Sequence, residues 1–161
     1  MNHALLLAEA MRTPWAMAPE HLATLAQVLA RWSVDRPASP EILAGVREEA
    51  AARRDRNTAV ARAGNGSIAV LPLWGIITQR GNMVDDVSGP GSMSTQKFTG
   101  ALRAALADDS IGGILIDIDS PGGSVFGIQE LADEIFQARQ TKPIVAIADS
   151  LAASAAYWIG A

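Results

Sequence analysis

The chain contains 161 residues, of which 49% are hydrophobic and 19% are charged, and its formal net charge is −4. This length predicts one domain with an appended segment, and the acidic balance argues against nucleic acid as a partner. Cysteine is absent, which excludes disulfides and thiol catalysis and makes a cytoplasmic location the expected one. The apolar run Ala4–Ala8 is far shorter than the ~20 residues of a membrane span, so no span is expected.

The first 63 residues predict an α-helical N-terminal segment. Pro19 is typical of a helix start, and apolar residues follow it at the spacing of one helix face. Two further prolines end this helix, and a second helix is expected over residues 41–62. Gly64-Asn65-Gly66 then breaks the pattern, so we expect one unit over 1–63 and another over 66–161.

From residue 66 onward, strands and helices are predicted to alternate. Runs of β-branched and aliphatic residues are typical of buried parallel strands. Because each strand–helix–strand crossover returns the chain in the same direction, the predicted fold class is α/β with a parallel sheet. The expected order is one or two strands over 68–77, a long loop over 80–94, a helix over 95–108, a strand over 113–118, a helix over 125–139 capped around Ser124, a strand over 143–148 and a helix from about Ser154.

Two of these strands end in turns of small residues, and the first turn is Ser120-Pro121-Gly122-Gly123. Proline fixes one backbone angle, and two glycines let the chain turn sharply with its N–H groups exposed. Such amides can hold an anion or a developing oxyanion, where each donor is worth about 3 kcal/mol in the transition state. The alternative is an ordinary glycine-rich connection.

The second turn offers Ser154, which stands among four alanines where a strand gives way to a helix. Small neighbours allow a peptide to approach, as at a nucleophile elbow, although the Gly-x-Ser-x-Gly pattern is missing. The amide of Ala155 is then a second oxyanion donor. The alternative is that Ser154 caps the helix. Ser120 and Ser124 are interpreted as turn and cap residues, and Ser150 is a weaker candidate nucleophile.

A nucleophilic serine needs a base, and these residues do not identify one. The only histidines, His3 and His21, precede the predicted sheet, which argues against a Ser-His-Asp triad. A Ser-Lys dyad is the known variant. Lys142 is predicted ~20 Å from Ser154, at the opposite edge of the sheet, and Lys97 is interpreted as a solvated lysine. Three acidic residues end the strands, but they do not predict a metal site. They are Asp117, Asp119 and Asp149.

Residues from about 66 to 161 resemble the serine peptidases of the signal peptide peptidase A family, within the ClpP/crotonase-like superfamily. The similarity is greatest to its branch of phage capsid-assembly, or prohead, proteases. The N-terminal Thr13-Pro14-Trp15-Ala16-Met17 also resembles that branch. The matching segments are Ile68 to Gly75, Ala107-Asp108-Asp109, Asp117 to Gly127, Lys142 to Ala146 and Ala152 to Ile159.

The resemblance implies a ClpP-like parallel sheet with crossover helices and assigns roles to residues of the two turns. Ser154 matches the family's nucleophile, and the amides of Gly123 and Ala155 match its oxyanion donors. Gly122 and Ser124 are expected to contact substrate. In this family the base is a lysine roughly fifty residues after the serine, so the chain is expected to be C-terminally truncated and its fold incomplete. No cofactor and no metal are expected.

The sequence therefore predicts a Ser-Lys endopeptidase. The resemblance implies protein substrates such as scaffold and capsid proteins, assembly into homo-oligomers, and a location in the bacterial cytosol or the phage prohead. Two alternatives stay open. One is a non-catalytic capsid assembly or scaffold component, favoured by the missing lysine. The other is a crotonase-like acyl-CoA enzyme, against which the segment Ala152 to Tyr157 counts.

Overall fold

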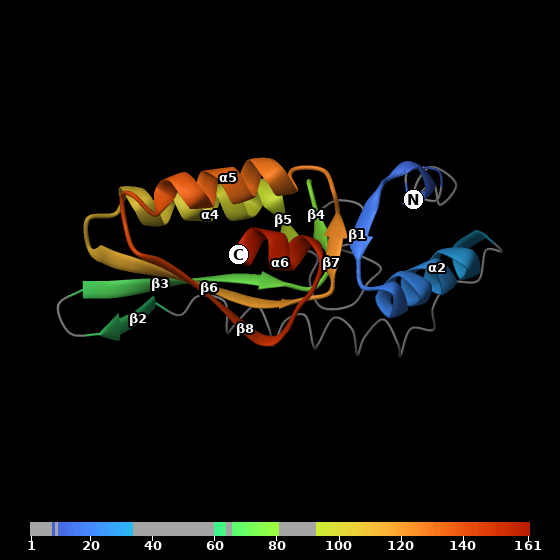
Figure 1. The fold of residues 1–161 in the computed structure, drawn as a ribbon, viewed down its shortest axis with the longest axis horizontal. Coiled ribbons are helices and arrows are strands. Elements are labelled where there is room, and N and C mark those ends of the chain that lie inside the picture. The colour runs from blue at the N-terminus through green and yellow to red at the C-terminus, as the bar shows by residue number, and fades with distance from the viewer. Residues whose placement is uncertain (1–7, 9, 34–59, 64–65, 81–92) are drawn as a thin grey trace.

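The computed structural model describes residues 8, 10–33, 60–63, 66–80 and 93–161. Within them the chain forms two four-stranded sheets and a set of helices (Figure 1). Among the described helices, none is both long enough and apolar enough to cross a membrane.

The larger sheet has the strand order β2-β3-β6-β8. Strands β3 (Gly66–Trp74), β6 (Ile111–Ser120) and β8 (Ile144–Ala152) are parallel, and β2 (Val60–Ala63) pairs antiparallel with β3. From Ile114 to Ser120 every second residue of β6 is buried, because alternate side chains of a strand point to one face. The predicted α/β class with a parallel sheet is therefore confirmed.

Two helices run side by side over one face of the larger sheet, as Figure 1 shows. They are α4 (Thr95–Ala107) and α5 (Ile128–Ala138), and the short α6 (Ala155–Gly160) follows β8. Their apolar stripes meet the buried face of the sheet. The core between them includes Leu73, Phe98, Leu102, Ile116, Ile118, Leu131, Ile135 and Ile159.

The smaller sheet joins segments that lie far apart in the sequence, in the order β1-β7-β4-β5. Strand β7 (Gly122–Ser124) lies between β1 (Trp15–Met17), which is antiparallel to it, and β4 (Ile77–Thr78), which is parallel. Strand β5 (Met93–Ser94) pairs with β4. Helix α2 (Pro19–Ser33) begins two residues after β1, in agreement with the predicted start at Pro19.

The N-terminal segment differs from the expected run of helices. Trp15–Met17 form a strand that pairs with β7, and Val60–Ala63 form a strand where the end of a helix was expected. Most of the predicted second helix, residues 41–59, lies outside the described residues. Tertiary pairing overrides local helix preference at both strands. The division into units 1–63 and 66–161 stays a prediction.

Two boundaries near the candidate turns were also predicted wrongly. Helix α5 begins at Ile128, with Gly127 as its N-cap, and not at residue 125 capped by Ser124. The reason is that Gly122–Ser124 join the smaller sheet as β7. Strand β8 continues to Ala152 rather than ending at residue 148, because a bulge keeps its far end paired with β6. Of the predicted long loop, residues 81–92 lie outside the described part.

Candidate active site

The two small-residue turns leave the larger sheet at neighbouring points. Ser120 at the end of β6 is paired with Ala152 at the end of β8, and the Ala153 N–H donates to the Ser120 carbonyl over 3.1 Å. The carboxyl ends of parallel strands share one edge, which is where α/β folds place their sites. The structure therefore places the Gly122 turn and the Ser154 turn at the same edge of the larger sheet.

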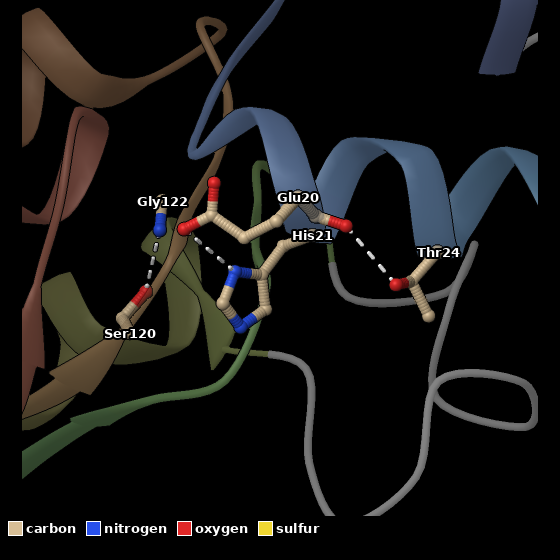
Figure 2. A network of polar contacts seen from close by, with 5 residues as sticks. All are labelled: Glu20, His21, Thr24, Ser120 and Gly122. Carbon is tan, nitrogen blue, oxygen red and sulfur yellow. Dashed lines mark hydrogen bonds and ion pairs between the residues drawn. The ribbon is translucent and has the colours of Figure 1, made fainter.

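A buried serine holds the first turn in shape. The Ser120 hydroxyl is fully buried and donates to the Gly75 carbonyl over 2.6 Å. It accepts from the Gly122 N–H over 3.1 Å (Figure 2). Gly122 has φ +98°, a backbone angle that residues with a side chain rarely adopt. A Cβ on Gly122 would overlap the Ala16 carbonyl oxygen and would lie 3.2 Å from the Ala155 amide nitrogen. Only glycine therefore fits where these backbones approach one another.

Gly123 lies in the middle of the smaller sheet. It is opposite Ala16 of β1 on one side and Ile77 of β4 on the other. A Cβ at this position would overlap the Ile77 backbone. The candidate oxyanion amide of Gly123 is thus held in a paired strand, and not in an open turn as the glycine pattern suggested.

Ser154 has a strained backbone, with φ 53° and ψ −116°. Of the described residues other than glycine, it alone has a positive φ. Such conformations cost about 1–3 kcal/mol and are concentrated at functional sites. The strain arises where β8 turns directly into α6, so the exposed Ser154 stands at a sharp strand-to-helix corner.

The alternative role of Ser154 as a capping residue is not supported. Its side chain makes no capping hydrogen bond to α6, although it occupies the N-cap position. Ala155 is buried and is the first residue of α6, where backbone N–H groups precede the intrahelical bonding pattern. Its amide is therefore placed to serve as a donor beside the Ser154 hydroxyl.

The competing hydroxyls differ from Ser154 in burial. Ser120 is enclosed by its two backbone bonds, and the buried Ser124 accepts from the Phe126 N–H over 3.2 Å, which fits their interpretation as turn residues. Ser150 is exposed on the bulge of β8, between the residues that pair with Ile118 and Ser120. Because Ser150 is exposed, burial does not argue against it as an alternative nucleophile.

The described lysines and the described histidine were the candidates for a base, and each makes contacts of its own. Lys142 donates from Nζ to the carbonyls of Ala105 (2.9 Å) and Asp108 (2.6 Å), at the C-terminal end of α4. It thus precedes β8, at the strand end opposite Ser154. Lys97 lies in the first turn of α4. His21, in the first turn of α2, lies 3.8 Å from Glu20 (Figure 2). His3 is outside the described residues.

Asp117 and Asp119 alternate with the buried residues of β6, and Asp149 is exposed near the end of β8. Burial and then the charge of Asp149 raise the pKa of Asp117 above its ordinary value. Within the described part of the chain, no three His, Asp or Glu side chains gather in a way that could hold a metal ion.

Comparison with known proteins supports the resemblance inferred from the motifs. The chain is 40% identical over 101 residues to the head-tail preconnector protein GP5 of Enterobacteria phage P21, covering 63% of this chain and 20% of that protein. It is 36% identical over 88 residues to the capsid assembly protease C of Escherichia phage lambda, covering 55% and 20%. It is 28% identical over 100 residues to a putative signal peptide peptidase SppA of Enterococcus faecium, covering 62% and 28%.

No family model matches the chain. The chain is nevertheless similar, over half its length or more, both to phage head-assembly proteins and to an SppA-type peptidase. The chain spans about a fifth of the length of the first two of these relatives.

Sequence reasoning missed one neighbour of the site, the strand β1. Thr13 to Met17 belong to the resemblance, which assigns them no role. The alternation of a three-residue strand is too short to be recognised, so no signal in the sequence predicted that Ala16 would lie opposite Gly123.

Proposed function

We propose that the chain carries the nucleophile and the oxyanion donors of a serine peptidase. The observation that supports this most directly is the strained, exposed Ser154 beside the Gly122 turn and the Ala155 amide. Strain of this kind persists where the surrounding structure imposes it for a function. The related phage and SppA-type proteins, two of which are named as a protease and a peptidase, point to the same chemistry.

In the proposed reaction the Ser154 oxygen attacks the carbonyl carbon of a peptide bond, and its proton passes to a base. The carbonyl oxygen becomes an oxyanion that the Gly123 and Ala155 amides stabilise, each by about 3 kcal/mol. The carbon–nitrogen bond then breaks, the amine leaves with the proton, and an acyl-enzyme remains on Ser154. Water releases the acyl group by the same steps in reverse order.

The proposed base is a lysine, as in the Ser-Lys type of peptidase. Lys142 does not suit this role, because its ammonium group is engaged by two carbonyls at the end of α4. The family resemblance points instead to a lysine roughly fifty residues after Ser154 as the base. Gly122 and Ser124 are proposed to contact substrate. The proposed substrates are scaffold and capsid proteins in an assembling phage head, cleaved by a homo-oligomer in the host cytosol or the prohead.

The test is covalent labelling of the full polypeptide by a fluorophosphonate, which reacts with activated serines. Labelling is expected on Ser154, to disappear in Ser154→Ala and to persist in Ser150→Ala, the matched control on the same bulged strand end. Persistent labelling of Ser154→Ala would move the nucleophile elsewhere. Absence of labelling in the wild-type protein would favour the non-catalytic assembly component instead.

A further inference from the structure

Strand β1 occupies the open edge of β7, directly beside the candidate oxyanion site. Two backbone bonds fix it there: the Ala18 N–H donates to the Pro121 carbonyl over 2.9 Å, and the Val125 N–H donates to the Pro14 carbonyl over 3.0 Å. Residues 14 to 18 are therefore held in an extended conformation along the strand that carries Gly123.

The register of this pair directs the Ala16 carbonyl at the Gly123 amide. In antiparallel strands, opposite residues alternate between hydrogen-bonded and non-hydrogen-bonded pairs. Ala18–Pro121 and Pro14–Val125 are bonded pairs, each two residues from Ala16–Gly123. Ala16 and Gly123 therefore form a hydrogen-bonded pair as well. The Ala16 carbonyl then accepts from the Gly123 amide, which is a donor proposed for the oxyanion.

The space around Gly122 places the same carbonyl near the second amide. A Cβ on Gly122 would overlap the Ala16 carbonyl oxygen and would lie 3.2 Å from the Ala155 amide nitrogen, so both atoms adjoin one small volume. A peptide carbonyl of the chain's own N-terminal segment thus pairs with one proposed donor, the Gly123 amide, and lies near the other, the Ala155 amide. A substrate must bring its scissile carbonyl to this same place.

The segment is anchored on both sides of Ala16. The Met17 side chain is 8% exposed, and the Trp15 indole donates to the Ala10 carbonyl over 2.9 Å. Helix α2 begins at Pro19, and its first turn bonds back to the Ala18 carbonyl. Ala16 itself carries only a methyl group at the position opposite Gly123.

On the basis of the proposed function, we infer that residues Pro14 to Ala18 are a tethered pseudosubstrate of this site. The site takes an extended peptide as an antiparallel strand on β7, with a small residue such as alanine contributing the carbonyl. The chain's own segment occupies that place and has to be displaced before a substrate binds. A tethered competitor acts at an effective concentration of about 1 mM, so it weakens binding in trans strongly.

A reversible cross-link tests this directly. Trp15 and Ser124 are opposite each other at a non-hydrogen-bonded position, where side chains are closest, and the chain has no native cysteine. The full polypeptide would carry Trp15→Cys, Ser124→Cys and Ser154→Ala, so that no cleavage occurs. Binding of a fluorescein-labelled peptide with the sequence of residues 13–18 is measured by anisotropy, before and after reduction.

Reduction is expected to increase the affinity for the labelled peptide at least tenfold, because it frees the tethered strand to exchange. A second variant, Ala16→Pro in the Ser154→Ala background, removes the Ala16 N–H and loosens the strand. It should bind the peptide more tightly than the matched Ala16→Ser variant, which keeps the N–H. Equal affinity in the oxidised and reduced proteins, or no binding to either, would overturn the inference.

The binding measurement is independent of catalysis, so the two proposals fail separately. If peptide binding depends on reduction but no serine is labelled by the fluorophosphonate, the peptidase proposal is wrong and the strand-binding site is supported. If Ser154 is labelled but the cross-link does not change the affinity for the peptide, the peptidase proposal is supported and the pseudosubstrate inference is wrong.

Discussion

The turn after β6 and the turn after β8 begin at paired residues but are built in opposite ways. After β6 the chain is buried and bonded: Ser120 holds Gly122, and Gly123 is paired on both sides. The last residues of β8 bulge and are exposed around Ser150, and the chain then reaches Ser154 in a strained conformation. A site of this kind needs rigid donors on one side and an accessible nucleophile on the other.

The largest expected effect comes from crowding the rigid turn. Gly123→Ala would drive a methyl group into the Ile77 backbone and is expected to lower the free energy of unfolding by about 3 kcal/mol. The matched control is Gly100→Ala, in the exposed middle of α4 with open space around it, which should stabilise by about 0.5–1 kcal/mol. Urea unfolding of the two variants measures both. A tolerated Gly123→Ala would mean that β4 and β7 are not packed as described.

The next effect comes from removing the hydroxyl that shapes the same turn. Ser120→Ala leaves the Gly122 N–H and the Gly75 carbonyl without this partner in a buried place, and we expect a loss of about 2 kcal/mol. Ser110→Ala is the control, because its hydroxyl bonds to Asp108 at an exposed position. Thermal unfolding should separate the two clearly. Equal shifts would argue that the buried bonds add nothing beyond exposed ones.

The strained turn should respond in the other direction. Ser154→Gly releases the backbone conformation and is expected to raise the free energy of unfolding by about 1 kcal/mol over Ser154→Ala, which keeps it. Both variants remove the hydroxyl, so neither should react with a fluorophosphonate. Denaturant unfolding of this pair isolates the strain from the chemistry. If Ser154→Gly is no more stable than Ser154→Ala, the corner is not strained.

The smallest effect concerns the acidic residues near the ends of β6 and β8. Because burial and Asp149 raise the pKa of Asp117, its charged form is disfavoured in the folded chain. Its unfavourable contribution is present at neutral pH and is relieved as the pH falls through the raised pKa. Asp117→Asn should therefore stabilise at pH 7 by about 0.5 kcal/mol, a small value because the side chain is only partly buried.

The gain from Asp117→Asn should fade as the pH approaches about 4, the ordinary range of an aspartate. Asp133→Asn, on the exposed side of α5, removes one charge away from the strand ends and serves as the control. Urea midpoints across this pH range provide the measurement. A gain that is constant with pH would show that repulsion at Asp117 is not its source.

Much of the larger sheet could be predicted from the sequence, because its strands are continuous apolar runs separated by amphipathic helices. Helix α4 was expected over 95–108 and is observed over Thr95–Ala107. The smaller sheet could not be predicted, since its strands are two to three residues long and come from four distant segments. For the same reason the start of α5 was placed wrongly, whereas the end of β8 was misplaced because a bulge keeps it paired with β6.

The sequence by itself determined that two small-residue turns would meet at one edge of a parallel sheet, because strand direction and crossover geometry follow from local patterns. It also singled out Ser154 and Gly123. Only the tertiary structure decided that Ser154 is strained, that Ser120 clamps Gly122, and that Ala16 lies against Gly123. These features depend on pairings between distant segments, and no local residue pattern encodes which backbone fills the space left by a glycine.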